Sequence, residues 1–252
     1  MDPGPTNAKN VGRSCFFAQK KVCYIGIPRK GEMPVSWRPY AIFDMDGTLL
    51  DSTGMWDLVA DRVLARWNMR FDEQDRDNTV ALTIEGTAQY YVQRYHLPVT
   101  APELADCIRT EARRAYTSCA TLKPGAADVV DALRAKGVRL CVASGTDKPL
   151  VDAALGHLGI LDRFEFTLSC LSPRGKQDPE VYLRALKAFG SPDPAQVMVF
   201  EDSPTALATA RQLGLYTVAV WDTYTADAWP DLGQTADSLC ERWPDWLAQN
   251  QM

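Results

Sequence analysis

The sequence predicts an α/β protein, in which a Rossmann-like parallel sheet core carries an inserted α-helical cap. Short apolar segments typical of buried strands alternate with helical patterns of about ten to twelve residues, as in βαβ units. In addition, several helical patterns with no strand between them follow the first strand directly. We therefore expect one α/β core that a helical unit interrupts after its first strand.

The first predicted strand is the apolar segment YAIFD, residues 40–44. Apolar residues then recur at helical spacing. These helical patterns cover roughly residues 55–67, 84–95 and 102–119. Beyond them strands are expected at 138–144, 164–168, 197–200 and 216–220, and helices at 125–136, 148–157, 179–189 and 204–213. The tail from 235 to 252 predicts one or two amphipathic helices in which Trp243 and Trp246 pack.

These patterns divide the chain into three parts. Residues 53–120 form the predicted helical cap, and residues 38–52 together with 121–252 form the predicted α/β catalytic core. Residues 1–37 are expected to be a disordered N-terminal extension.

The beginning of the chain is basic and lacks the uninterrupted apolar core of a signal peptide. Its segment RKGEM, residues 29–33, is what a purine-rich ribosome-binding site followed by a start codon would encode. We therefore expect Met33 to be the true start, with a targeting peptide as the alternative. Mass spectrometry of the protein from its own source tests this, because peptides from residues 1–32 would contradict it.

Composition restricts the function classes. The chain has 252 residues, 46% of them hydrophobic, and is long enough for a large core plus a small satellite domain. A net charge of −5 and the lack of a basic run argue against nucleic-acid binding. Seven scattered cysteines without a CxxC pair indicate reduced thiols, and no apolar run reaches the roughly 18 residues of a membrane span. We expect a cytoplasmic protein that binds neither nucleic acid nor membrane and is monomeric by default.

Polar residues stand at the ends of the predicted strands or in the loops after them. Ligands of parallel α/β sheets bind at this edge, so these side chains should converge. The candidates are Asp44, Asp46, Ser144, Lys176, Glu201 and Asp202. Several carboxylates at one edge repel one another, and a hard divalent cation such as Mg²⁺ removes that repulsion. Taken singly, each residue is more often a helix cap, a turn residue or a surface charge. Their joint occurrence in this order favours a functional site.

A site with Mg²⁺, a lysine, a small hydroxyl and a spare carboxylate suits phosphoryl transfer, which depends mostly on positioning and charge neutralisation. The spare carboxylate can attack phosphorus and form an aspartyl-phosphate. A second carboxylate two residues on can protonate the leaving oxygen and later activate water.

These residues resemble the four motifs of the haloacid dehalogenase-like superfamily. The matching features are DMDGT at 44–48, a strand that ends in Ser144, Lys176 ahead of DPEVYL, and FEDS at 200–203. The resemblance covers essentially residues 38–222. The helices after the first motif resemble the subgroup with a helical cap, which includes phosphatases and β-phosphoglucomutase-like proteins. One departure is Gln177, where the family commonly has proline after the lysine.

The resemblance implies a role for each motif residue. Asp44 would be the nucleophile and a Mg²⁺ ligand, and Asp46 would be the general acid and base, with its backbone carbonyl also on the metal. Ser144 and the N–H of Gly145 would hold the phosphoryl group. Lys176 would pair with Asp44 and the phosphate. Asp202, with Glu201 nearby, would complete the metal shell.

The sequence also distinguishes among the chemistries of this superfamily. Its dehalogenases lack the second aspartate, whereas Asp46 is present here. Its phosphonate-cleaving members need a cap lysine, and residues 51–120 contain none. Its mutases use basic cap residues to bind a second phosphate, and the cap segment ALTIEGTAQYY, residues 81–91, has no cation. Phosphomonoester hydrolysis therefore fits best, with a β-phosphoglucomutase-like mutase or a non-catalytic binding protein as alternatives.

The predicted substrate is a small phosphorylated metabolite such as a sugar phosphate. Polar cap residues, among them Glu85, can hydrogen-bond to its hydroxyls. Trp56 and either Tyr90 or Tyr91 can stack on a sugar ring, or they can simply pack the cap helices.

Overall fold

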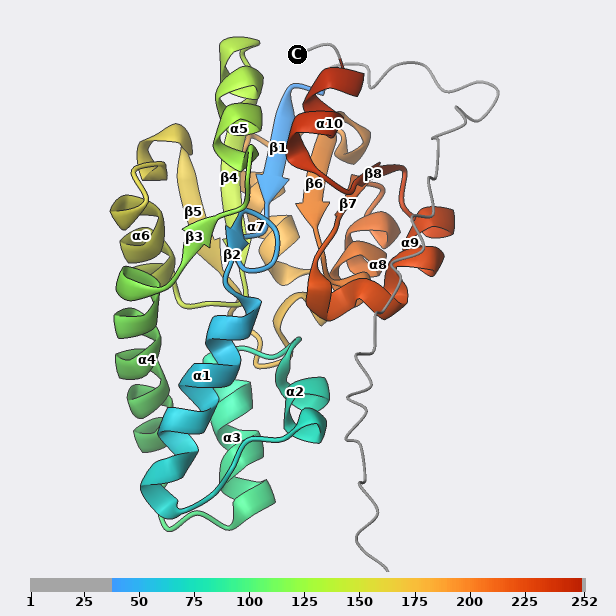
Figure 1. The fold of residues 1–252 in the computed structure, drawn as a ribbon. Coiled ribbons are helices and arrows are strands. Elements are labelled where there is room, and N and C mark those ends of the chain that lie inside the picture. The colour runs from blue at the N-terminus through green and yellow to red at the C-terminus, as the bar shows by residue number, and fades with distance from the viewer. Residues whose placement is uncertain (1–37, 251–252) are drawn as a thin grey trace, which may run out of the picture. The chain divides into compact units, whose positions relative to one another are not determined.

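The computed structural model of the chain describes residues 38–250, and the features predicted for residues 1–37 lie outside this range. Its centre is a six-stranded sheet in the order β5-β4-β1-β6-β7-β8 (Figure 1), and all neighbouring strands are parallel. The strands are β1 (Tyr40–Phe43), β4 (Arg139–Ser144), β5 (Phe166–Ser169), β6 (Val197–Glu201), β7 (Tyr216–Val220) and β8 (Ser238–Cys240). The predicted α/β class is confirmed.

Strand β1 lies in the middle of the sheet. Phe43 pairs with Val142 of β4 on one side and with Phe200 of β6 on the other. The side chain of Phe43 is fully buried, and its ring stacks on the ring of Phe200 at a centroid distance of 4.4 Å. Because both faces of β1 are covered, its sequence is continuously apolar rather than alternating.

Helices cover both faces of the sheet. One apolar cluster contains Ile42, buried residues of α7 and Ala210 of α8, and the other contains Phe43, Trp243 and Trp246. The core helices are α5 (Ala126–Ala135), α6 (Lys148–His157), α7 (Glu180–Ala188), α8 (Pro204–Gln212), α9 (Trp229–Thr235) and α10 (Trp243–Gln249). Short 3₁₀ helices are η2 (Leu161–Arg163), η3 (Gly175–Gln177), η4 (Pro194–Gln196) and η5 (Thr223–Ala228).

Four helices, here called the cap helices, lie beyond the carboxyl ends of the strands (Figure 1). They are α1 (Thr53–Leu64), α2 (Glu73–Thr79), α3 (Ile84–Tyr95) and α4 (Ala101–Ser118), with the 3₁₀ turn η1 (Ala65–Trp67) after α1. The chain leaves the core through β2 (Leu50–Asp51) and returns through β3 (Thr121–Leu122), and these two segments pair antiparallel. The two crossings therefore lie side by side.

Several short elements were not predicted, among them α2 and β8. Helix α2 has the polar sequence EQDRDNT, and it is held at its start by a capping box between Asp72 and Asp75 instead of an apolar stripe. Strand β8 has only three residues at the sheet edge.

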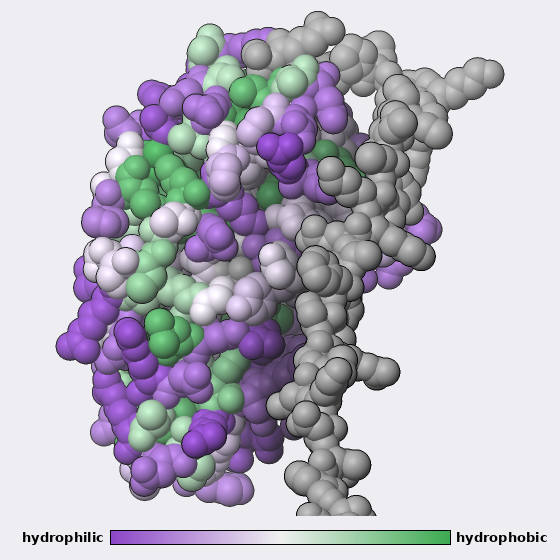
Figure 2. Space-filling model, viewed as in Figure 1, coloured by the Kyte–Doolittle hydropathy of each residue, from purple (hydrophilic) through white to green (hydrophobic). Residues whose placement is uncertain are grey.

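On the face shown in Figure 2, apolar residues form small separate groups among hydrophilic ones. Within residues 38–250, none of the helices combines the length and the apolar character that a bilayer span requires.

Candidate active site

The motif residues meet at the carboxyl edge of three neighbouring strands. Asp44 directly follows β1, Ser144 ends β4 and Glu201 ends β6. The backbone N–H of Asp44 donates to the carbonyl of Phe200 at 2.9 Å, which continues the ladder between β1 and β6. The parallel register thus brings together side chains that lie more than 150 residues apart.

The chain turns sharply after Asp44. Gly47 has a φ of +77°, and a Cβ at this position would lie 2.6 Å from Oδ2 of Asp202. Its N–H donates to the carbonyl of Leu50 at 3.0 Å, and the N–H of Leu50 donates to the carbonyl of Met45 at 2.9 Å. A glycine is therefore required here both for the backbone conformation and for the close approach of Asp202.

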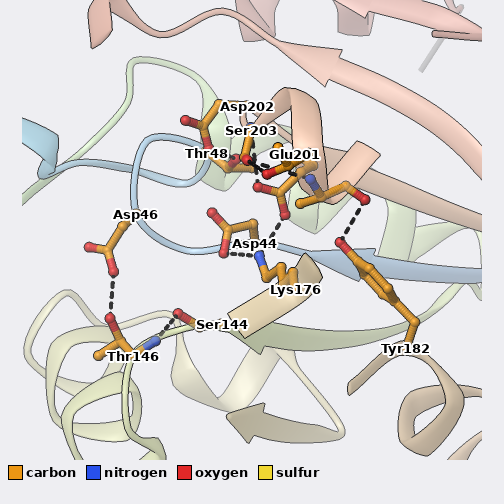
Figure 3. A network of polar contacts seen from close by, with 12 residues as sticks. Asp44, Asp46, Thr48, Ser144, Thr146, Lys176, Tyr182, Glu201, Asp202 and Ser203 are labelled. Carbon is orange, nitrogen blue, oxygen red and sulfur yellow. Dashed lines mark hydrogen bonds and ion pairs between the residues drawn. The ribbon is translucent and has the colours of Figure 1, made fainter. Parts of the chain in front are cut away.

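Three buried acidic residues, Asp44, Glu201 and Asp202, bring one carboxylate oxygen each to within 4.8 Å of one another. Lys176 of η3 lies against this group (Figure 3): its Nζ contacts Oδ1 of Asp44 and lies 2.5 Å from Oε2 of Glu201. Thr48 donates to Oδ1 of Asp202 at 3.0 Å. The fold thus places more negative than positive charge among these buried side chains.

The electrostatics of this group follow from its burial. Burial and the charge of Asp44 raise the pKa of Glu201 to about 7. Burial and the neighbouring Glu201 raise the pKa of Asp202 well above its usual range. Burial opposes the charge on Lys176, but Asp44 and Glu201 outweigh it, so the pKa of Lys176 is raised and the ammonium form persists.

A Mg²⁺ ion fits this donor set, because carboxylate oxygens are its preferred ligands and a divalent cation would offset the excess negative charge. The residues that would hold it are Asp44, Glu201 and Asp202. The resemblance implied a metal contact for Asp46 through its backbone carbonyl only. Its carboxylate points away from this group toward Thr146 (Figure 3).

Asp46 is surrounded by hydroxyl groups. Ser52 donates to its Oδ1 at 2.5 Å and Thr146 to its Oδ2 at 2.9 Å. The hydroxyl of Tyr116 lies 2.8 Å from Oδ1 and 2.7 Å from Oδ2. Burial, together with the charge of Asp44, raises the pKa of Asp46, which favours a carboxyl group that can carry a proton.

Ser144 and Gly145 lie at the same edge. Ser144 is 1% exposed, and its hydroxyl accepts a hydrogen bond of 3.0 Å from the N–H of Thr146. Gly145 faces the cap, since a Cβ there would lie 3.7 Å from the carbonyl of Leu82. Both residues line the cavity described next.

A cavity of about 440 Å³ lies between the motif residues and the cap helices. The six candidates from strand ends and loops line it, as does Gly145, which the resemblance added: Asp44, Asp46, Ser144, Gly145, Lys176, Glu201 and Asp202. The cap contributes a largely apolar wall, with Trp56, Phe71, Ile84, Tyr91 and Ile108. The cavity therefore has a charged floor and a largely apolar cover.

Arg76 and Asp57 also line this cavity. Arg76 binds Asp57 through two nitrogens, with Nη2 2.6 Å from Oδ2 and Nε 3.1 Å from Oδ1. Tyr224 of η5 donates to the same carboxylate at 3.2 Å. The sequence analysis did not predict a cation in this cavity. Arg76 lies on helix α2, whose polar sequence lacks the apolar spacing from which helices were predicted.

The cap residues proposed for substrate contact are placed differently from one another. Glu85 is not brought to the cavity: its side chain is 53% exposed and forms an ion pair with Arg109. Trp56 and Tyr91 line the cavity, whereas Tyr90 donates to Asp75 within the cap. Tyr116 was not predicted as a site residue, because its position in the helical pattern of α4 indicates only an ordinary buried residue.

The model of the haloacid dehalogenase-like hydrolases matches residues 40–214 of the chain. The chain belongs to this family, and the fold and the acidic edge described above are consistent with it. It is therefore an enzyme of the hydrolase class and, with its curated relatives, one of the family's phosphatases.

Three comparisons illustrate the relationship. Protein CbbY of Rhodobacter capsulatus is 31% identical over 223 residues, which cover 81% of this chain and 97% of that protein. The probable pseudouridine-5'-phosphatase of Drosophila melanogaster is 28% identical over 189 residues, which cover 73% of this chain and 81% of that protein. The crystal structure of CbbY from Rhodobacter sphaeroides in complex with phosphate has a TM-score of 0.73 at 21% identity, covering 85% of this chain and 99% of that one.

Proposed function

We propose that the protein is a Mg²⁺-dependent phosphomonoester hydrolase that acts on a small phosphorylated metabolite, such as a sugar phosphate, through an aspartyl-phosphate on Asp44. The observation that carries this proposal is the position of Asp44. It lies on the floor of the cavity with Lys176 on one side, two further carboxylates beside it, and the hydroxyl-bound carboxyl of Asp46 two residues on.

In the first step, a carboxylate oxygen of Asp44 forms a bond to phosphorus while the bond from phosphorus to the ester oxygen breaks. The leaving oxygen takes its proton from Asp46, so the product leaves as a neutral alcohol. Ser144 and the N–H of Gly145 orient the phosphoryl oxygens, and Lys176 neutralises part of their charge. A Mg²⁺ ion held by Asp44, Glu201 and Asp202 would supply further positive charge at this place.

In the second step, water attacks the phosphorus of the aspartyl-phosphate and the bond to Asp44 breaks. Asp46, now ionised, takes one proton from that water, which restores both side chains and releases inorganic phosphate. Cap helices that close over the cavity keep out bulk water during the first step, and their opening releases the products.

The cap favours a substrate with one phosphate. Arg76 is a cation of the cavity wall, but its two-point ion pair with Asp57 already satisfies it. A second phosphate would have to compete with that carboxylate, whereas sugar hydroxyls can bind to both partners of the pair. This supports a monophosphate hydrolase over a mutase, which needs a firm hold on a second phosphate. The Drosophila relative is named as a probable pseudouridine-5'-phosphatase.

We also propose that the protein acts as a monomer in the cytoplasm. The cysteines Cys107, Cys119, Cys141, Cys170 and Cys240 are free thiols, which supports a reducing compartment.

The test is phosphate release with Mg²⁺ from p-nitrophenyl phosphate and from a panel of sugar and polyol monophosphates. The parent should turn over, Asp44→Asn should lose activity by at least about a thousandfold, and Asp162→Asn should be unchanged because that carboxylate is exposed on η2. A parent with no turnover on the whole panel would refute the proposal. Conversion of a hexose 1-phosphate to its 6-phosphate would instead support the mutase.

A further inference from the structure

Tyr116 lies in the last turn of α4, the helix from which the chain leaves the cap. Its side chain is fully buried, and its ring packs edge-on against Trp56 at a centroid distance of 6.0 Å. Tyr116 therefore belongs to the cap by its backbone, but its hydroxyl reaches across to the core.

The hydroxyl of Tyr116 contacts both oxygens of Asp46, at 2.8 and 2.7 Å, and lies 3.3 Å from Oγ1 of Thr146. One phenol can donate only one hydrogen bond but can also accept. It can therefore serve Asp46 in either protonation state: it donates to the ionised carboxylate and accepts from the neutral acid. The same holds for the hydroxyls of Ser52 and Thr146.

Each of the two segments that connect the core with the cap helices supplies a hydroxyl group that contacts Asp46. Ser52 follows β2 on the outward crossing, and Tyr116 precedes β3 on the return, while Thr146 comes from the core. The paired segments β2 and β3 fix these two donors relative to each other. Of these three hydroxyls around Asp46, the one of Tyr116 comes from a cap helix, so this residue ties Asp46 to the position of the cap.

We propose that Tyr116 is a positioning residue for Asp46: its hydroxyl holds the Asp46 carboxyl group in the orientation in which it gives its proton to the leaving oxygen and later takes one from water. This inference rests on the proposed phosphatase function, because it assigns a supporting group to the acid and base of that reaction. Tyr116 itself touches neither phosphorus nor the leaving oxygen.

The need of the leaving group for a proton distinguishes this role from a merely structural one. A p-nitrophenolate leaving group departs without a proton, whereas the alkoxide of benzyl phosphate needs one. Both substrates carry one phosphate and one phenyl ring, so their fit to the apolar cover is similar. The ratio of their kcat/KM values within one preparation does not depend on how much of the protein is folded.

The experiment compares the parent with Tyr116→Phe, which removes only the hydroxyl, on these two substrates. We expect kcat/KM for benzyl phosphate to fall about tenfold or more, while the value for p-nitrophenyl phosphate changes less than about twofold. Hydrolysis of the aspartyl-phosphate also uses Asp46, so this second step should become slower with either substrate. For p-nitrophenyl phosphate, kcat and KM should therefore fall by the same factor, which leaves kcat/KM unchanged. In an Asp46→Asn background, Tyr116→Phe should leave the substrate ratio unchanged.

Tyr95→Phe is the matched control, since it removes a cap hydroxyl whose partners are the carbonyl of Arg70 at 2.8 Å and Oδ2 of Asp75, and the side chain does not line the cavity. Its substrate ratio should equal that of the parent. An unchanged ratio in Tyr116→Phe, or an equal loss on both substrates, overturns the inference while the phosphatase proposal stands. A parent that turns over neither substrate overturns both.

Discussion

The Nζ atom of Lys176 lies 2.5 Å from Oε2 of Glu201, and the two side chains are 8% and 3% exposed. The same nitrogen contacts Asp44. One ammonium group thus serves two carboxylates that belong to different motifs. Since these side chains are almost completely buried, each of the charges depends on the others for its stabilisation.

Replacing Lys176 by methionine should therefore affect both stability and activity. Lys176→Met leaves Asp44 and Glu201 without their cation, and it should lower the free energy of unfolding by about 3–5 kcal/mol. Activity should fall at least about a hundredfold, because the phosphoryl oxygens lose a positive charge. Urea unfolding and phosphate release measure the two effects.

The control is Lys148→Met. Lys148 pairs with Asp152 at 2.6 Å, but its side chain is 53% exposed, so the change should cost less than about 1 kcal/mol. Equal unfolding free energies for the two variants would contradict the view that burial makes the Lys176 pair important.

Mg²⁺ should stabilise the protein, and the gain should grow with pH. Burial and Asp44 raise the pKa of Glu201 from 4.5 to about 7. Between these values the folded, metal-free protein binds more protons than the unfolded chain, so its stability falls as the pH rises through that window. Mg²⁺ binds the ionised carboxylates, so its contribution is small at the low end and largest above the folded pKa.

This is checked by melting temperatures at about pH 5.5 and about pH 8, each with EDTA and with excess Mg²⁺. We expect the larger Mg²⁺-dependent increase at the higher pH. In Glu201→Gln this pH dependence should shrink, because the titrating group is gone. A Mg²⁺ effect of equal size at both values would show that Glu201 is not part of the metal site.

Much of the fold and of the charged floor of the cavity is predictable from the sequence. The buried strands are continuous apolar runs, and β4, β1 and β6 prove to be neighbours. Residues that end neighbouring parallel strands must meet, which is why Asp44, Ser144 and Glu201 were found together. Local sequence thus determines this half of the site.

The cap side could not be predicted in the same way. Arg76 lies on a helix that is held by polar caps, and Tyr116 looks like any buried residue of an amphipathic helix. Glu85 shows the remaining difficulty. Ile84 and Thr87 of the same helix line the cavity, but successive helical residues point about 100° apart, so Glu85 faces Arg109 instead. Which face turns inward depends on packing that no local pattern contains.

Gly86 is expected to control how closely the cap approaches the core. It lies in the first turn of α3, and a Cβ there would lie 2.3 Å from the carbonyl oxygen of Pro173. Thr83 donates its N–H to the same oxygen at 3.2 Å. Gly86→Ala should therefore displace the loop that leads to Lys176, lower the free energy of unfolding by about 1–3 kcal/mol and raise KM.

Gly156→Ala provides the comparison, because Gly156 is also helical but its added Cβ would meet nothing closer than 3.8 Å. There the substitution should stabilise the protein by up to about 1 kcal/mol through helix propensity. Urea unfolding and steady-state kinetics measure both variants. If Gly86→Ala were as stable and as active as the parent, the close contact between α3 and Pro173 would not be maintained in solution.

The thiols provide a last test, of how tightly the loop before Lys176 is closed. Cys119 is exposed, whereas Cys141, Cys170 and Cys240 are buried. Burial raises the pKa of Cys170 to about 12, although the charge of Lys176 opposes this, so little of the reactive thiolate is present near neutral pH. Iodoacetamide should modify Cys119 in the native protein and the three buried thiols only after unfolding, as read by mass spectrometry of the peptides.

Cys170 is the informative residue, because it follows β5 and lies at the start of the loop that carries Lys176. Its amide is held by the carbonyl of Ser144 at 2.9 Å. Rapid native labelling of Cys170, with Cys141 still protected, would mean that this loop opens while the sheet stays intact. In that case Lys176 would leave Asp44 for part of the time, and Lys176→Met would cost less stability than expected above. Protection of both thiols supports a loop that holds Lys176 against Asp44 before any substrate binds.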